Sequence, residues 1–420
     1  MTVTSLGECP YDSPLTHYVS DEVLVPAGIE WTRGQVPLDL QLFEKAGPRA
    51  KLYFDPKQVR AGIVTCGGLC PGLNNVIRSL VYGLHHQYGV KEVLGFRDGY
   101  RGLDPQRGEE PIPLTLDLVD DIHEEGGTIL GTSRGPVDTK TAVDNLIRLE
   151  IDALFTVGGD GTQRGAKSLY EEAMRREYPL AVVGVPKTID NDVHFVARTF
   201  GFSTAVEAAR EVIANAHTEA HSVHNGVSVV KLMGRHAGFI AATATVASQD
   251  VNFCLIPESP FVLNGDGGFL AALQRRLVAR RHAVIVVAEG AGQDLIPGET
   301  GAVDASGNAK LEDIGKFLCD EITKCFKAQE LEVVVRYFDP SYQIRSRPAN
   351  SDDAVLCDRF ARGAVHAAMA GKTGMIVGLL HGELVHVPIG LPVQSRKEVK
   401  MDGDLWHGVL ACTGQPAQFA

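Results

Sequence analysis

The sequence of 420 residues lacks the features that mark several large classes of protein. No apolar run is long enough to cross a bilayer, and the amino terminus has neither the basic region nor the apolar core of a signal peptide. We therefore expect a cytoplasmic protein with no membrane partner. The formal net charge of −12 argues against a nucleic-acid partner, so an anionic substrate has to be held by a local cluster of basic residues.

Sequence signatures of metal sites and of reactive nucleophiles are also missing. The eight cysteines are scattered without metal-ligand spacing, and we expect reduced, mostly buried thiols. Cys66 and Cys70 are separated by three residues, which is the wrong spacing for a redox pair. No G-x-S-x-G segment supports a serine nucleophile. His217, His221 and His224 follow helical spacing without an accompanying carboxylate or cysteine set, so we predict a polar helix end there.

What the sequence does have is a regular alternation of short apolar strands with amphipathic helices. The predicted strands are 61–66, 91–96, a short one leading into 131–135, 152–157, 181–185, 226–232, 254–258, 282–288, 332–338 and a pair within 373–389. The predicted helices are 73–89, 117–126, 141–149, one that follows 158–165 and runs to about 176, 204–220, 266–281, 311–328 and 358–370. This order predicts an α/β protein with two doubly wound, mostly parallel, Rossmann-like sheets.

We predict a division of the chain into four parts, with a domain boundary near residue 205. Residues 1–58 are rich in proline and poor in periodicity, which predicts an extension draped over the main body. The first domain spans 59–205 and takes in a return segment at about 346–392. The second domain spans 206–345, and a tail follows at 393–420.

The segment AVVGVPKTIDND at 181–192 is the stretch around which the other motifs are arranged. A buried strand ends at a proline, and a loop follows that holds Lys187, Thr188, Asp190 and Asp192. In open α/β sheets, ligands bind just beyond the carboxyl ends of the strands. Two carboxylates, a hydroxyl and an ammonium suit proton abstraction next to a phosphate, whereas a polar turn with a capping Asx residue would need only one of them.

Two glycine turns, GGLCPG at 67–72 and GGDGTQRG at 158–165, each join a strand to a helix. Such turns let the backbone and a helix amino terminus approach a phosphate, although plain strand-to-helix geometry is an alternative. Neither turn matches the P-loop or the dinucleotide consensus. Asp160 would repel a phosphate unless Mg²⁺ lay between them, or it could simply cap the following helix. Arg134 suits a phosphate as well as a surface position.

Further charged residues follow other predicted strands. Arg235 stands in MGRHAG and Glu289 in VVAEGAG. Arg336, Arg345 and Arg347 cluster in VVVRYFDPSYQIRSR, which suits a phosphate ester. Each could be an ordinary surface charge, but their shared position after strands points to one site.

With PKTIDND, GGDGT, MGR, AEG and YQIR in this order, the chain resembles the 6-phosphofructokinase family from about residue 61 to 392. It is most similar to the plant and protist type of ATP-dependent enzyme, which shares runs like CGGLCPGLN, GGTILGTSRG and VVKLMGRHAGFIA. The resemblance implies an active site between two domains, one binding the nucleotide and the other the sugar phosphate. It also implies Mg²⁺-assisted transfer from the co-substrate ATP to the 1-hydroxyl of fructose 6-phosphate, and a homodimer or homotetramer.

The resemblance divides the site residues into three groups. Asp190 is the implied general base, and the other implied catalytic residues are Thr188 and Arg235. The implied nucleotide-binding residues are Gly68, Arg134, Gly135, Gly159, Asp160, Gly161, Thr162, Gln163 and Lys187, with Asp160 also holding the metal. The implied sugar-phosphate residues are Thr188, Asp190, Asp192, Met233, Gly234, Arg235, Glu289, Arg336, Tyr342 and Arg345. Arg336 matches the place where the family lends an arginine from a neighbouring subunit.

The phosphoryl donor is the open point. Gly161 resembles the ATP-using enzymes and Lys187 the pyrophosphate users, and the plant and protist ATP enzymes combine both, which favours ATP. Gly226 replaces a second intersubunit arginine of the bacterial enzymes, so we expect the phosphate clamp to be rebuilt from Arg336 and Arg347. The alternatives are a pyrophosphate-dependent phosphotransferase and a non-catalytic sensor of sugar phosphate or nucleotide.

Overall fold

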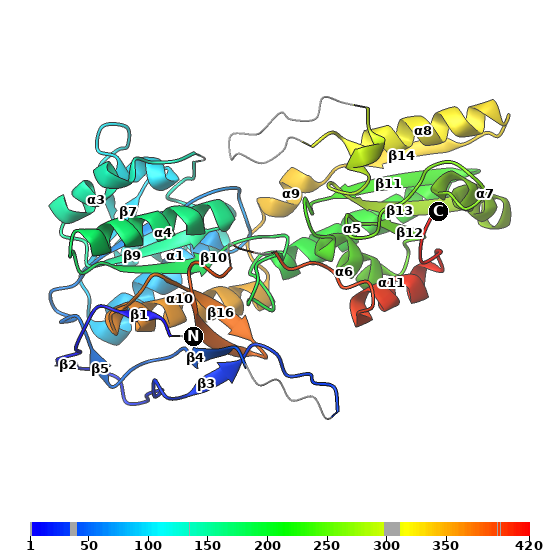
Figure 1. The fold of residues 1–420 in the computed structure, drawn as a ribbon. Coiled ribbons are helices and arrows are strands. Elements are labelled where there is room, and N and C mark those ends of the chain that lie inside the picture. Colours follow the sequence, from blue (N-terminus) through cyan, green and yellow to red (C-terminus); the bar gives the residue numbers. More distant parts are fainter. Residues whose placement is uncertain (1, 34–39, 134, 298–310, 393, 395) are drawn as a thin grey trace. The chain divides into compact units, whose positions relative to one another are not determined.

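The structure is a computed structural model that describes residues 2–33, 40–133, 135–297, 311–392, 394 and 396–420 (Figure 1). The chain forms two compact units. The first comprises Met1–Ile189, Val193–Gly201 and Ser346–Arg396, and the second comprises Asp190–Asp192, Phe202–Arg345 and Lys397–Ala420. Within the described ranges, no helix is both long and apolar enough to span a membrane.

The first unit is built on a nine-stranded sheet with the order β3-β4-β17-β16-β10-β9-β6-β7-β8. Its inner strands are parallel and comprise β6 (Arg60–Thr65), β7 (Glu92–Phe96), β9 (Ala153–Gly158), β10 (Ala181–Pro186) and β16 (Met375–Leu380). The outer strands run antiparallel to their neighbours and comprise β3 (Leu24–Pro26), β4 (Leu42–Lys45), β8 (Ile112–Pro113) and β17 (Glu383–Pro388).

Helices cover both faces of this sheet. The pair α1 (Leu73–Tyr82) and α10 (Ser351–Met369) packs together, and so does the pair α3 (Thr139–Arg148) and α4 (Asp160–Arg175) (Figure 1). Every residue of β9 and β10 is buried, which explains why both strands are continuously apolar instead of alternating. Their carboxyl ends lie side by side, because Pro186 pairs with Gly158.

The second unit has a four-stranded parallel sheet with the order β12-β13-β11-β14. These strands are β11 (Gly226–Leu232), β12 (Phe253–Leu255), β13 (His282–Ala288) and β14 (Val334–Phe338). Its helices are α5 (Phe202–His221), α6 (Phe239–Ser248), α7 (Phe269–Arg280), α8 (Ile314–Ala328), α9 (Ser341–Arg345) and α11 (Asp404–Thr413). Near the end of the chain, Phe419 packs on Phe253 and Phe269, so the tail is part of this core.

The predicted α/β class with two doubly wound sheets is confirmed, but two local predictions are wrong. The stretch 117–126 is not one helix, because like charges four residues apart weaken it, and only α2 (Leu116–Val119) and the 3-10 turn Ile122–Glu124 form. Among the described residues, no strand leads directly into 131–135, since Gly127 and Gly131 have positive φ and build a turn. The helix predicted for 73–89 forms as α1 followed by a π-helical segment, Gly83–Tyr88.

Residues 1–58 are integrated in the first unit. Their strands β3 and β4 extend the main sheet through β17. Two small sheets pair β1 (Thr4–Ser5) with β15 (Lys372–Thr373) and β2 (Tyr11–Asp12) with β5 (Lys51–Leu52). The extension is thus held by backbone hydrogen bonds to β15 and β17, which both come from the carboxyl-terminal part of the unit.

The buried hydroxyl of Thr373 supports β10 from the side. It accepts a hydrogen bond from the Val182 amide at 3.0 Å and donates to the Leu180 carbonyl at 2.9 Å. The isosteric change Thr373→Val leaves both backbone groups buried without this partner, so it is expected to cost about 1–3 kcal/mol of unfolding free energy. Urea denaturation measures the loss. Thr4→Val, at an exposed hydroxyl, is the control and should stay within about 0.5 kcal/mol; equal losses would contradict the assignment.

Candidate active site

Lys187 is the first residue of the loop after β10. Its backbone amide and its side-chain ammonium both form hydrogen bonds within the first unit. Its amide donates to the Gly158 carbonyl at 3.0 Å, and its Nζ donates to the Gly68 carbonyl at 2.6 Å. The side chain is buried, with the whole residue 6% exposed. Lys187 therefore links the two glycine turns that the sequence singled out. One residue further on, the Thr188 carbonyl accepts a hydrogen bond from Thr199 Oγ1 at 2.7 Å.

The second half of the loop, Asp190–Asp192, belongs to the second unit. Part of the surface of Asp190 is accessible to solvent. The carboxyl is nevertheless largely desolvated by the protein atoms packed around it. This burial, together with repulsion from Asp192 and Glu289, raises the pKa of Asp190 well above its usual value, against the opposing effect of Arg235. A carboxyl with a raised pKa beside an arginine is the kind of group that serves as a general base.

Arg235 and Glu289 come together because β11 and β13 are neighbouring parallel strands. The Glu289 amide donates to the Leu232 carbonyl at 2.9 Å, and the Gly290 amide donates to the Gly234 carbonyl at 3.1 Å. Gly234 has a φ of +133°, and a side chain at Gly290 would collide with the Arg235 carbonyl, so this close approach requires both glycines. Burial raises the pKa of Glu289, against the opposing charge of Arg235.

The other predicted sugar-phosphate residues take different positions in the second unit. Met233 is buried at the end of β11. Arg345 lies on α9, close enough for its charge to lower the pKa of Glu289, and its guanidinium stacks 4.4 Å from the Tyr342 ring centre. Arg336 does not join this group: its Nε pairs with Glu219 of α5 at 2.8 Å, and its side chain is 39% exposed.

The GGDGT turn joins β9 to α4 in the first unit. Gly159 is the residue that precedes the helix, and no side chain caps it. The alternative that Asp160 caps α4 is therefore wrong. The Asp160 carboxylate instead accepts a hydrogen bond from Arg396 Nε at 3.2 Å.

Gly161 differs from its neighbours in having open space beside it. A Cβ atom there would meet nothing closer than Arg164 Nη2 at 3.9 Å, and its backbone needs no positive φ. A side chain at Gly158, by contrast, would collide with Thr162. Glycine at 161 is thus not required by the chain's own packing, which is the pattern expected where a ligand needs the room.

Two predicted nucleotide contacts have structural tasks of their own. Gln163 is 4% exposed, and its Nε2 donates to the Gly158 carbonyl at 2.9 Å. Thr162 is buried, and its carbonyl accepts a hydrogen bond from Tyr100 at 2.6 Å. Both side chains are buried, so they offer little surface to a ligand. Their role is to support the turn from inside.

The loop before residue 135 lies against the first glycine turn. Thr132 Oγ1 donates to the Gly67 carbonyl at 2.6 Å, and the Gly67 amide donates to Ser133 at 3.3 Å. Gly135 has a φ of +109° with open space beside it. Arg134, a predicted nucleotide contact, lies outside the described residues.

Two functional candidates, the neighbours Arg396 and Lys397, were not predicted from the sequence. Arg396 pairs with Asp160, as described above. Lys397 Nζ donates to Asn191 Oδ1 at 3.0 Å, and burial lowers the pKa of Lys397 to about 8. Two adjacent basic residues in a tail were the only sequence signal, and surface tails often carry such pairs.

Asp160 is a single carboxylate at the start of α4. Among the described side chains, no group of three or more histidines, cysteines and acids could hold a metal ion. One carboxylate still fits Mg²⁺, since this ion usually keeps several waters and binds through one or two carboxylates plus substrate phosphates.

Parallel strands that end in glycine turns, carboxylates and arginines define a class of α/β proteins that hold phosphates at the strand ends. The chain belongs to the phosphofructokinase family, whose model, described as Phosphofructokinase, matches residues 60–368. This match covers the strand-end turns of both units and therefore includes every motif of the candidate site.

Curated relatives are similar to nearly the whole chain. The ATP-dependent 6-phosphofructokinase of Borreliella burgdorferi is 47% identical over 99% of this chain and 96% of the relative. The enzyme of the same name from Amycolatopsis methanolica is 48% identical over 100% and 95%. The one from Trypanosoma brucei brucei is 49% identical over 89% and 76%.

Solved structures share the fold at lower identity. A pyrophosphate-dependent phosphofructokinase from Nitrosospira multiformis has a TM-score of 0.70 at 18% identity, covering 85% of this chain and 92% of that one. The T-state phosphofructokinase of Pichia pastoris has a TM-score of 0.66 at 23% identity, covering 84% of this chain but 37% of that longer chain. At these identities the likeness shows the fold alone.

Proposed function

We propose that the protein is an ATP-dependent 6-phosphofructokinase, which transfers a phosphoryl group from ATP to the 1-hydroxyl of fructose 6-phosphate and yields fructose 1,6-bisphosphate and ADP. The observation that carries this proposal is Asp190, a partly exposed carboxyl with a raised pKa beside Arg235. Relatives that are 47–49% identical and carry the name ATP-dependent 6-phosphofructokinase support it.

In the proposed mechanism, Asp190 takes the proton from the sugar 1-hydroxyl as the oxygen attacks phosphorus. A carboxylate whose pKa lies well above 3.8 is a stronger base than an ordinary aspartate. Arg235 stabilises negative charge on the transferred group, because its guanidinium is permanently charged. Glu289, Tyr342 and Arg345 are proposed to bind the sugar phosphate in the second unit.

The first unit is proposed to bind the nucleotide. The free N–H groups at the start of α4 and the open space at Gly161 suit a polyphosphate. Asp160 is the residue that would hold Mg²⁺, which neutralises charge on the phosphate oxygens when bound. Lys187, anchored on the Gly68 carbonyl, would keep the two glycine turns at a constant spacing.

The donor decides between this proposal and its rival, a pyrophosphate-dependent phosphotransferase, which Lys187 favours. The purified protein is assayed with fructose 6-phosphate and either ATP or pyrophosphate, with fructose 1,6-bisphosphate measured by a coupled reaction. Turnover with ATP supports the proposal. Turnover with pyrophosphate alone would overturn it, and no turnover with either donor would favour the sensor.

We further propose that the protein works in the cytoplasm as a homodimer or homotetramer. The half-exposed Arg336 guanidinium supports this, because the resemblance implies that this residue serves a neighbouring subunit. Sedimentation equilibrium measures the oligomeric state.

Arg396 has a predictable effect on the magnesium requirement. Its guanidinium neutralises Asp160, so a bound cation has to displace it. The two side chains are 33% and 25% exposed, and such a pair is worth about 0.2–1 kcal/mol. Arg396→Gln is therefore expected to lower the Mg²⁺ concentration for half-maximal activity about 1.5- to 5-fold. Arg198→Gln, which breaks a surface pair with Asp352, is the control. A higher Mg²⁺ requirement would contradict this role of Arg396.

A further inference from the structure

A cavity of about 510 Å³ lies in the first unit. Its lining comes from residues 5–51, the segment without an assigned role, and from residues 370 and 372 just after α10. All of these residues lie outside the stretch 60–368 that matches the phosphofructokinase family. The cavity therefore lies outside the stretch that the family model matches, and none of the residues proposed for catalysis lines it.

The lining is rich in positive charge. Three cations of the lining, Arg49, Lys51 and Lys372, face one carboxylate of the lining, Asp21. Lys51 Nζ also lies 2.7 Å from Oδ1 of the exposed Asp12, which is outside the lining. Hydroxyl groups complete the wall and come from Ser5, Tyr18 and Ser20. This surplus of cations is notable in a protein with a formal net charge of −12, which otherwise repels anions.

Arg49 is a built part of this wall. The residue is 5% exposed, and its guanidinium is held by backbone carbonyls, through Nη1 to Gly47 at 3.0 Å and Nη2 to Lys45 at 2.9 Å. Its Nε donates to Asp21 Oδ1 at 2.7 Å. These fixed contacts hold a planar, permanently charged donor in place, which lowers the entropy lost when an anion binds.

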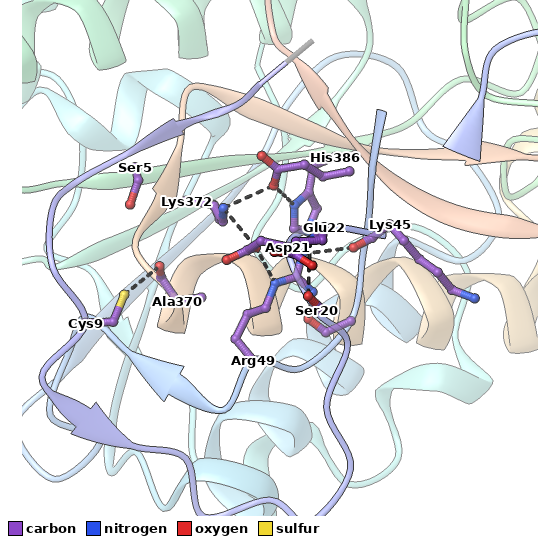
Figure 2. A network of polar contacts seen from close by, with 12 residues as sticks. Ser5, Cys9, Ser20, Asp21, Glu22, Lys45, Arg49, Ala370, Lys372 and His386 are labelled. Carbon is purple, nitrogen blue, oxygen red and sulfur yellow. Dashed lines mark hydrogen bonds and ion pairs between the residues drawn. The ribbon is translucent and has the colours of Figure 1, made fainter. Parts of the chain in front are cut away.

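Lys372 provides the second fixed cation. Its Nζ lies 3.1 Å from Asp21 Oδ1 and 3.1 Å from Glu44 Oε2, and the residue is 8% exposed. Behind it, the buried His386 Nδ1 lies 3.3 Å from the same Glu44 oxygen. Figure 2 shows Asp21, Arg49, Lys372 and His386 converging at one place. Lys372 thus contacts two carboxylates, the buried Glu44 and the more exposed Asp21.

Among the charged residues of the cavity, Asp21 is the one that a bound anion could replace. Its side chain is 60% exposed, and it sits in a turn outside any helix or strand. One oxygen, Oδ1, accepts from both Arg49 and Lys372, as a bound anion would. Burial alone would raise the pKa of Asp21, but the hydrogen bonds from Arg49 and Lys372 hold that pKa below its usual value, so the carboxylate is charged at neutral pH.

We propose that this cavity binds a small phosphate monoester, which displaces Asp21 from Arg49 and Lys372. A phosphate accepts bidentate hydrogen bonds from a guanidinium. Once Asp21 has swung away, the lining itself holds three cations, and the remaining carboxylates are Glu44 beside Lys372 and Asp12 beside Lys51. The cavity volume falls within the range of about 300–1,000 Å³ that is usual for small-molecule sites, so there is room for a short carbon chain beside the hydroxyl groups.

The test is isothermal titration calorimetry of the full chain with glycerol 3-phosphate, and with succinate as a carboxylate probe. Asp21→Asn removes the competing anion at an exposed position and is expected to tighten glycerol 3-phosphate binding about 1.5- to 5-fold, as expected for an ion pair of this exposure. Lys51→Gln is expected to weaken it about two- to fivefold. Lys91→Gln, an exposed lysine outside the cavity, is the matched control and should change nothing.

Unchanged or weaker binding to Asp21→Asn would overturn the proposal, and so would an unchanged affinity of Lys51→Gln. Succinate binding as tightly as glycerol 3-phosphate would overturn the assignment to phosphate. The variants alter only cavity residues, so these outcomes do not depend on the phosphoryl donor or on the reaction in the candidate active site.

Discussion

Replacing Asp190 with asparagine is expected to lower kcat about 10²- to 10⁴-fold, because the amide cannot accept the proton of the sugar hydroxyl. The KM for fructose 6-phosphate should change little, since the amide keeps the shape and the hydrogen-bonding capacity of the carboxyl. The coupled assay with ATP measures both constants. In the unchanged protein, activity should rise with pH on the acid side, at a pH above the ordinary aspartate pKa of 3.8.

The same change is expected to stabilise the protein at neutral pH. The pKa of Asp190 is raised in the folded state, so its contribution to stability is full below the unfolded pKa near 3.8 and is lost as the pH rises through the folded pKa. When the carboxyl of Asp190 ionises, burial and repulsion from Asp192 and Glu289 disfavour the charged form. Asparagine removes this cost, so the gain in Tm should grow as the pH rises.

Thermal unfolding between pH 5.5 and 8 checks this expectation, with Asp138→Asn as the control of opposite sign. Hydrogen bonds from Thr141 lower the pKa of Asp138, which precedes α3, so its removal should destabilise the protein at neutral pH. Full turnover of Asp190→Asn would exclude Asp190 as the base. If Asp190→Asn loses turnover without a gain in Tm, the proposed repulsion of Asp190 by Asp192 and Glu289 is contradicted. The sensor would be favoured if the unchanged protein shows no turnover and binds fructose 6-phosphate, and if Asp190→Asn loses that binding.

Gly161→Asp is expected to abolish the use of ATP, with a loss in kcat/KM on the order of 10²-fold or more. The new carboxylate would fill the open space beside the start of α4 and repel the nucleotide phosphates, and such like-charge contacts cost several kcal/mol. The fold should be unaffected, because the nearest atom to the new Cβ is 3.9 Å away and the backbone conformation is ordinary.

Two further variants control this experiment. Gly161→Ala adds only a methyl group and should retain most activity. Gly158→Ala should lower the Tm instead, because its methyl group collides with Thr162. If Gly161→Asp still uses ATP, this turn does not hold the nucleotide. If it gains turnover with pyrophosphate, residue 161 selects the donor.

The secondary structure and most motif positions could be predicted because their signals are local. The runs ALFTVG and AVVGVP are continuously apolar, which indicates strands covered on both faces, and the structure buries every residue of both. Ligands bind beyond the ends of such strands, so the predicted position of Asp190 follows from the same rule. The helix prediction for 117–126 failed because it rested on the helical pattern alone and took no account of repulsion between acidic residues four positions apart.

The contacts of Asp160 could not be predicted, because its partner Arg396 is 236 positions away. The same holds for the pairing of β3 and β4 with the main sheet, since short strands from a proline-rich segment carry no signal about their partners. Neither pairing leaves a periodic pattern. Both depend on the whole unit having folded.

By itself, the sequence determined the α/β class, the order of strands and helices, and the loops that carry the reactive groups, because hydrophobic periodicity and glycine turns act over a few residues. Only the tertiary structure decided that Asp160 pairs with Arg396 instead of capping α4, that Gly161 borders open space, and that residues 5–51 build a cationic cavity with Lys372. These properties depend on electrostatic and packing interactions between residues far apart in the chain, and such distances close only when the chain folds.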